Sequence, residues 1–203
     1  MLRRILPLAR PLTPPLSPSL AALAERLARR TAIETSDPER RWAAVALILA
    51  PDPASLLLIR RAERAGDPWS GQVGLPGGRR GPEDADLVET ATRETVEEVG
   101  IDLTRAHRLG ALDDVAPRTP TLPLIAVRPY VFALPGRPPV RLNPEVASCH
   151  WVEVSHLARP GASRLTTVTI RGNSLQVPAF TLEGMVVWGM TERILVSFLQ
   201  AVS

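Results

Sequence analysis

Residues 78–101 read GRRGPEDADLVETATRETVEEVGI, and the interpretation of the chain starts from this stretch. Glycine at its start permits a tight turn, and Gly100 near its end suits the left-handed position that closes many helices. Between them, Asp84 or Asp86 is a candidate N-cap for a helix that runs to Val99. The stretch therefore predicts a loop, a helix and a second loop in succession.

Three glutamates of this helix lie on one face. At about 100° per residue, Glu94, Glu97 and Glu98 fall on the same side, and Arg93 precedes Glu97 by one helical turn, close enough to orient it. Crowded carboxylates repel one another unless a positive charge lies between them. Mg²⁺ is typically bound through one or two carboxylates together with substrate phosphates. A solvated acidic face is the alternative, and spacing alone favours that alternative.

The two glycines at 77 and 78 change this balance. A glycine turn that leads into the acidic helix lets the backbone approach a metal ion, and a carbonyl of Gly78 can serve as a further oxygen ligand. Such a turn followed by three stacked glutamates is unusual for an ordinary surface. We therefore expect a metal site.

The same stretch resembles the Nudix box. In that box a glycine and an acid precede the pattern Arg-Glu-apolar-x-Glu-Glu-x-Gly-apolar. The matching residues are Gly78, Arg93, Glu94, Glu97, Glu98, Gly100 and Ile101. Three features depart from the pattern: the first acid is Asp84 where glutamate is usual, the segment from Asp84 to Arg93 is one residue longer, and Thr95 occupies a position that is usually apolar.

Segments outside the box are similar to the branch of the Nudix family that cleaves coenzyme A. This branch has Leu-Leu-x-x-Arg, then Gly-x-x-x-x-Pro-Gly-Gly, before the box, and Trp-Gly-x-Thr near the end. This chain has LLIRR at 57–61, GQVGLPGG at 71–78 and WGMT at 188–191. The longer spacing in the box also looks like that branch, whereas the loop GDPWS at 66–70 does not match it. The resemblance covers about 42–203.

The resemblance implies a Nudix fold of the α/β (α+β) class, with a mixed β-sheet sandwiched between α-helices and the box as loop–helix–loop. It also implies hydrolysis of a diphosphate linkage that depends on Mg²⁺ or Mn²⁺, with Glu94, Glu98, Glu97 and the Gly78 carbonyl as metal ligands. Coenzyme A is the first-choice substrate, giving 3′,5′-ADP and 4′-phosphopantetheine. ADP-ribose or another nucleotide derivative is one alternative, and a catalytically silent binding module is the other.

Further residues are candidates for the site. In several Nudix proteins a glutamate at the position of Glu145 reaches the metals or acts as a general base, although a loop acid is an equal alternative here. Arg61, Arg118, Gly77 and Gly78 are candidate substrate contacts, although an ordinary loop arginine is at least an equal alternative for Arg118. Trp69 could stack on a base, but core packing is its expected role.

Cysteine and histidine do not form a convincing site. Cys149 and His150 are neighbours on an expected strand, so their side chains point to opposite faces. His107 and His156 belong to no motif.

Composition excludes several other classes. All 24 basic residues are arginine, which excludes a phosphate-loop lysine, a Schiff-base lysine and a Ser-x-x-Lys nucleophile. The arginines are scattered pairs and aromatics are only 4%, which does not favour nucleic-acid binding.

The longest apolar run, 43–50, is too short to cross a membrane. The single cysteine, Cys149, fits a reducing compartment. We expect a cytoplasmic protein, with a homodimer as an open possibility.

We expect the chain to divide into an arm at 1–40 and, as the resemblance implies, a Nudix domain at 41–203. The arm is Pro-rich to residue 18, then has a short amphipathic helix at 19–30 and a polar linker. Strands are expected at 42–50 and 54–60, which form a hairpin, and at 72–75, 107–115, 123–134, 147–153, 164–170 and 174–180. A small helix is expected at 154–158 and a last helix at about 191–202. The strand-rich order indicates an α+β domain and not a doubly wound parallel sheet.

Overall fold

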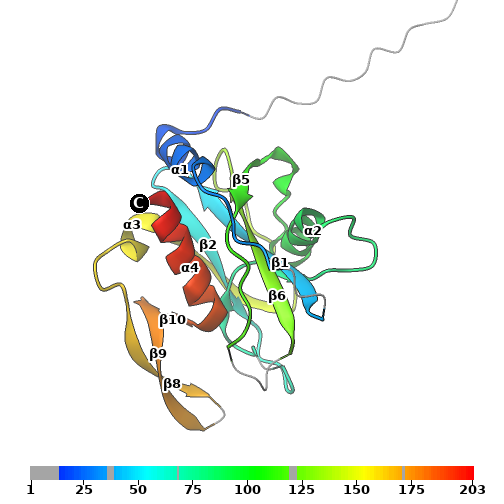
Figure 1. Ribbon diagram of the computed structural model, residues 1–203, viewed down its shortest axis with the longest axis vertical. Coiled ribbons are helices and arrows are strands. Elements are labelled where there is room, and N and C mark those ends of the chain that lie inside the picture. Colours follow the sequence, from blue (N-terminus) through cyan, green and yellow to red (C-terminus); the bar gives the residue numbers. More distant parts are fainter. Residues whose placement is uncertain (1–13, 36–38, 68, 119–122, 171) are drawn as a thin grey trace, which may run out of the picture.

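The computed structural model describes residues 14–35, 39–67, 69–118, 123–170 and 172–203 (Figure 1). The larger sheet contains β1 (Arg41–Ala50), β2 (Ser55–Arg61), β3 (Val73–Gly74), β4 (Gly77–Arg79), β5 (His107–Ala111), β6 (Ile125–Ala133) and β7 (Val146–Glu153). Its strand order is β3-β2-β1-β6-β5, with β4 also pairing with β1 and β7 with β2. Strands β1 and β6 are parallel and the other pairs are antiparallel, so the expected mixed sheet is confirmed.

Strand β1 is the centre of the sheet because both of its faces are apolar. Ala44, Ala46 and Ile48 belong to one buried cluster, whereas Leu47 and Leu49 belong to another. Successive side chains of a strand point to opposite faces, so the continuous apolar run suits a strand that is covered on both sides. The sheet must therefore be covered by other elements on both faces, which gives the fold its layers.

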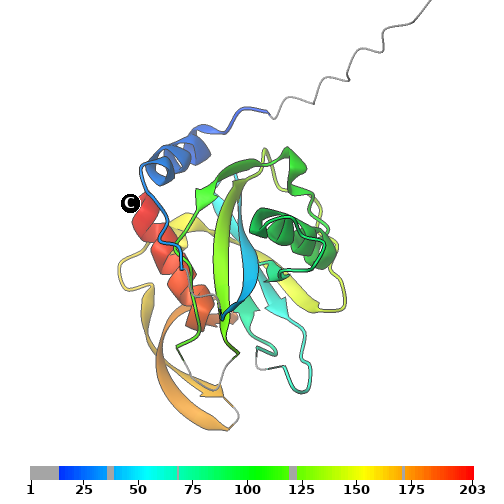
Figure 2. The same ribbon diagram turned by 45° about the vertical axis from the view of Figure 1, so that its right-hand side comes forward.

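Helices cover both faces of the sheet. Figure 2 shows the sheet between α2 (Leu87–Val99, green) and α4 (Gly189–Val202, red). Helix α2 packs on the cluster that contains Ala44 and Ile48, and α4 contributes Leu195 and Phe198 to the opposite cluster. The expected sandwich is therefore confirmed.

The short helix of the N-terminal arm is α1 (Pro18–Ala28), and it packs against the domain. Its Leu20 and Leu27 are buried in the same cluster as α4. Arg26 Nη1 donates a hydrogen bond to the Val202 carbonyl at 2.6 Å, which joins α1 to the end of α4. Residues 1–13 of the Pro-rich segment lie outside the described residues.

A second sheet lies beyond the first and leads into α4. It is formed by β8 (Ser163–Ile170), β9 (Asn173–Leu182) and β10 (Met185–Trp188), in the order β10-β9-β8 (Figure 1, orange). The sequence did not predict the four-residue strand β10, and α4 begins at Gly189 instead of Thr191. The short elements α3 (Val154–Leu157) and η1 (Leu103–Arg105) complete the described fold. No described helix is long and apolar enough to cross a membrane.

Two expected segments differ from the structure. Gly77 and Gly78, expected as a turn, are the first two residues of strand β4, because the two glycines allow close pairing with β1. The strand expected at 107–115 ends at Ala111, after an irregularity between Arg108 and Gly110. Val115 then makes only an isolated bridge to Val127.

Candidate active site

Helix α2 begins and ends at the positions that its sequence specifies. Asp86 is the N-cap, and its side chain accepts a hydrogen bond from the Glu89 N–H at 2.8 Å. Gly100 closes the helix with φ 69°, and its N–H donates to the Val96 carbonyl at 3.0 Å. Of the two candidate caps, Asp86 is therefore correct, which leaves Asp84 for another role.

Asp84 is the buried partner of Arg93. The guanidinium donates to the carboxylate at 2.8 and 2.9 Å, and the Gly81 N–H and the Thr90 hydroxyl donate to it at 2.7 and 2.9 Å. Hydrogen bonds from Arg93 hold the pKa of Asp84 well below its usual range, although burial opposes them. The longer loop of the box therefore still brings its acid to the arginine.

Arg93 also orients two of the expected metal-binding glutamates. Its Nη1 donates to Glu94 at 2.9 Å and to Glu97 at 3.2 Å. Hydrogen bonds to Asp84 raise the pKa of Arg93 above its usual value, and the contacts with Glu94 and Glu97 add to this shift. Thr95, which departs from the box pattern, is fully buried and donates its hydroxyl to the Ala91 carbonyl at 2.7 Å. Its polar group is thus satisfied within the helix.

The two glycines of β4 have different roles. At Gly77, a Cβ atom would lie 2.3 Å from the Ala44 carbonyl oxygen, so only glycine permits this pairing with β1. At Gly78, a Cβ atom would lie 2.4 Å from the Glu94 carboxyl carbon. Because Gly78 has no side chain, the Glu94 carboxylate can occupy the space beside its backbone.

Glu98 is the most deeply buried of the three glutamates, with 3% of its side chain exposed. It accepts a hydrogen bond from the Gly77 N–H at 2.9 Å, and Arg61 Nη1 lies 3.9 Å from its other oxygen. Burial raises the pKa of Glu98 to about 7, and the negative charges of Glu94 and Glu145 contribute. Burial likewise raises the pKa of Glu94.

The donor set fits a hard divalent cation. Glu94 and Glu98 line one cleft and supply carboxylate oxygens that the protein only partly compensates, while Gly78 of β4 lies beside Glu94. One or two carboxylates, completed by water and substrate phosphates, are the usual ligands of Mg²⁺. Within the described ranges no group of three or more acidic, histidine or cysteine side chains is arranged so that it could hold a metal ion. Glu97 is 53% exposed and is held by Arg93, so it is the outermost of the three.

The cleft around these carboxylates has a volume of about 550 Å³ and is lined by residues of both α2 and α4. It contains four of the predicted site residues in addition to Glu94 and Glu98: Arg61, Gly77, Gly78 and Glu145. Glu145 is 46% exposed and pairs with Arg64 at 3.2 Å. Arg118 is exposed near Arg193 and is not among the described residues that line the cleft.

The cleft also contains residues that the sequence did not single out. Asp67 accepts hydrogen bonds from Arg61 at 2.8 Å and from the Trp69 N–H at 2.9 Å. These bonds lower the pKa of Asp67 although burial opposes the shift. Trp69 is partly exposed and lines the cleft. The expectation that it packs in the core was therefore wrong. Met190 and Thr191 also line the cleft. They belong to the WGMT segment, and its resemblance to the coenzyme A branch was the sequence signal that could have identified them.

The family model described as the NUDIX domain matches residues 39–169. The chain belongs to the Nudix family. The match spans the whole box at residues 78–101, so the loop, helix and glycines described above lie within the matched region. The hydrolase class expected from the resemblance is confirmed.

Relatives and solved structures agree with this assignment. This Nudix chain is 32% identical over 163 residues to the uncharacterized Nudix hydrolase NudL of Photorhabdus laumondii, covering 80% of this chain and 85% of that protein. It is 44% identical over 110 residues to an uncharacterized protein of Schizosaccharomyces pombe, covering 52% of this chain and only 33% of that protein. A MutT/nudix family protein from Enterococcus faecalis has a TM-score of 0.54 at 18% identity, covering 91% of this chain and 70% of that one, which supports the fold alone.

The histidines and the cysteine of this Nudix hydrolase do not line the cleft in the described part of the chain. His107 Nε2 lies 2.6 Å from the Pro14 carbonyl oxygen, where the segment before α1 meets the domain. His150 lies 3.0 Å from the Ser148 hydroxyl on β7, and His156 is 47% exposed near Glu153. Their roles are structural or at the surface.

Proposed function

We propose that this Nudix hydrolase cleaves the diphosphate linkage of a nucleoside diphosphate derivative, with coenzyme A as the preferred substrate. One observation carries the proposal: Glu94 and Glu98 lie in a single cleft, and the protein only partly neutralises them. The expected products are 3′,5′-ADP and 4′-phosphopantetheine.

The carboxylates would hold Mg²⁺ or Mn²⁺ in this cleft. When bound, the ion neutralises the diphosphate and lowers the pKa of a bound water. The chain's own residues keep the ligands in place. Arg93 orients Glu94, and the Gly77 N–H orients Glu98. Gly78 leaves room for the Glu94 carboxylate, and the Gly78 carbonyl is the further candidate ligand.

The reaction that we propose is a direct displacement. The oxygen of water forms a bond to one phosphorus, the bridging P–O bond breaks, and the second phosphate leaves with the bridging oxygen. The attacking water must give up a proton, and Glu145 is the candidate acceptor because it lines the cleft and is partly exposed. Arg64, which lies 3.2 Å from Glu145, would position that carboxylate.

Three separate segments support coenzyme A as the substrate. The segments LLIRR, GQVGLPGG and WGMT, which resemble the coenzyme A branch, all contribute residues to the cleft: Arg61, Gly74 and Thr191, respectively. WGMT lies more than a hundred residues after the other two segments, so its position at the same cleft is what a shared binding role requires. Specificity within a fold usually resides in such loops and segment ends.

A substrate panel tests the proposal. Purified protein is assayed with coenzyme A, acyl-coenzyme A, ADP-ribose, NADH and diadenosine polyphosphates, with Mg²⁺ or Mn²⁺ and with EDTA. We expect metal-dependent cleavage, with the highest kcat/KM for coenzyme A. A higher value for ADP-ribose would place the protein with the alternative substrate class. No cleavage of any compound would indicate a binding module.

We also infer a cytoplasmic location, because a single cysteine is suited to a reducing compartment. Fractionation of the source cells tests this inference, and recovery from an oxidising compartment would contradict it. Light scattering during gel filtration decides between a monomer and the homodimer that the sequence left open.

A further inference from the structure

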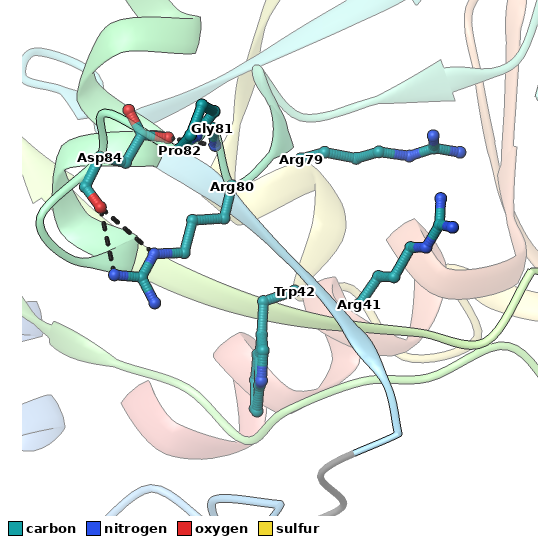
Figure 3. A pocket seen from close by; sticks show the side chains of 7 residues that line it. All are labelled: Arg41, Trp42, Arg79, Arg80, Gly81, Pro82 and Asp84. Carbon is teal, nitrogen blue, oxygen red and sulfur yellow. Dashed lines mark hydrogen bonds between the residues drawn. The ribbon is translucent and has the colours of Figure 1, made fainter.

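We propose that Arg41 and Arg79 form a subsite for a phosphate monoester that the substrate carries separately from its diphosphate. The inference rests on the proposed function and specifies the substrate class further. The two arginines line a pocket of about 470 Å³ at the end of β1 and β4 (Figure 3).

Strand pairing brings the two arginines to the same face of the sheet. Arg79 is opposite Ala43 in the antiparallel β1–β4 pair, and Arg41 precedes Ala43 by two residues. Residues two apart on a strand share a face, and diagonal neighbours lie about 7–8 Å apart, within reach of long side chains. In Figure 3 both side chains extend in the same direction, whereas Trp42 and Arg80 point away from them.

Arg41 and Arg79 differ in their partners from three other arginines near the carboxylates. Arg61 and Arg64, which line the cleft, and Arg93 of α2 are each paired with a carboxylate. In contrast, Arg41 and Arg79 are exposed, and neither side chain makes an ion pair or a hydrogen bond with another described residue.

Other groups in the pocket do not compensate these charges. Arg93 already engages the Asp84 carboxylate, and Arg80 donates to the backbone carbonyls of Asp84 and Ala85. The one carboxylate among the lining residues, Asp84, is thus already engaged, and a bound anion would supply the charge partner that Arg41 and Arg79 lack among the described residues.

The position of Arg79 connects this pocket to the diphosphate site. Arg79 lines both the pocket and the catalytic cleft. It directly follows Gly78, against which the Glu94 carboxylate lies. An anion between Arg41 and Arg79 would therefore lie beside a diphosphate held at Glu94 and Glu98.

This arrangement fits the chemistry of coenzyme A. Its 3′-phosphate and its 5′-diphosphate are attached to the same ribose, so the protein must bind them at adjacent positions. A guanidinium group can form two parallel hydrogen bonds to phosphate oxygens. Dephospho-coenzyme A and ADP-ribose lack the 3′-phosphate and would not use the subsite.

A comparison of two substrates tests the proposal. The kcat/KM values for coenzyme A and dephospho-coenzyme A are measured for wild type, Arg41→Gln, Arg79→Gln and the double variant. We expect wild type to prefer coenzyme A by about ten- to a hundredfold, the effect of charge-assisted hydrogen bonds. The ratio should fall toward one in the double variant. Arg108→Gln, which removes an exposed arginine on β5, is the matched control and should keep the wild-type ratio.

A binding measurement supplies a readout without turnover. Calorimetry with 3′,5′-ADP and 5′-AMP should show tighter binding of 3′,5′-ADP to wild type and to Arg108→Gln, and equal binding of both to the double variant. If the double variant keeps the preference in both experiments, the subsite is wrong while coenzyme A cleavage stands. If no diphosphate is cleaved, the proposed function fails, and calorimetry alone decides whether the arginines bind the monoester.

Discussion

Asp84 and Glu98 are two carboxylates of the same Nudix box, and each has 3% of its side chain exposed. Their environments are nevertheless opposite. Hydrogen bonds from Arg93 hold the pKa of Asp84 well below its usual range, whereas burial raises the pKa of Glu98 to about 7. Equal burial therefore leads to opposite electrostatic outcomes.

The difference lies in what the protein supplies to each carboxylate. Asp84 accepts from a guanidinium, a hydroxyl and a backbone N–H, so its negative charge is compensated within the fold. Glu98 accepts one backbone N–H, and Arg61 lies 3.9 Å away. Asp84 thus joins the loop at Gly81 to helix α2, whereas the charge of Glu98 is left available for the proposed cation. The predictions below test this division.

The largest effect is expected at Glu98. Replacement by glutamine removes the charge of a proposed metal ligand while keeping the shape of the side chain, so turnover should fall by about a hundredfold to a thousandfold, as with other major electrostatic groups. The measurement is kcat at saturating Mg²⁺, with circular dichroism to confirm folding. A folded variant with near-normal turnover would remove Glu98 from the metal site.

Arg93 should mainly affect stability. Arg93→Met leaves Asp84 buried without its ion-pair partner, and breaking a buried pair in this way costs about 3 kcal/mol or more of unfolding free energy. Urea denaturation measures the loss. Arg108→Met removes an exposed arginine and should change stability by less than about 0.5 kcal/mol. Equal losses in the two variants would show that the Arg93–Asp84 pair is not structural.

Glu98 should make the metal-free protein less stable as the pH rises. The folded pKa of about 7 lies above the unfolded value near 4.5, so the folded state binds the extra proton between these values. Wild type should therefore lose up to about 3 kcal/mol from this group between pH 4.5 and 7. Urea denaturation in EDTA across this range should show Glu98→Gln gaining stability relative to wild type as pH rises. A difference that does not vary with pH would contradict the raised pKa.

The smallest effect on turnover is expected at Glu97. Its side chain is 53% exposed and its contact with Arg93 is at the surface, so Glu97→Gln should lower kcat by less than about tenfold. The assay is the same as for Glu98→Gln. A loss as large as that of Glu98→Gln would show that all three glutamates contribute equally when the metal is bound.

Periodic features made much of the fold predictable from sequence. The apolar run of β1, the amphipathic face of α2 and the closing Gly100 each specify local structure, and those elements agree with the structure. Strands β4 and β10 were missed because they are short, and β4 is largely glycine. Their strand conformation depends on pairing with distant segments.

The candidate site was predictable only in part, for a related reason. The box motif placed Glu94, Glu97 and Glu98 on one helix, but it did not distinguish the buried Glu98 from the exposed Glu97. That distinction depends on packing against β4. The pairing of Arg61 with Asp67 and the juxtaposition of Arg41 with Arg79 likewise arise from tertiary structure.

The most direct test of the division between Asp84 and Glu98 is a side-by-side measurement of unfolding free energy for Asp84→Asn and Glu98→Gln at pH 8 in EDTA. Both substitutions neutralise a buried carboxylate and preserve its shape. We predict opposite signs: Asp84→Asn loses stability because Arg93 loses its charged partner, and Glu98→Gln gains stability because an uncompensated charge is removed. A loss of similar size in both variants would contradict this account.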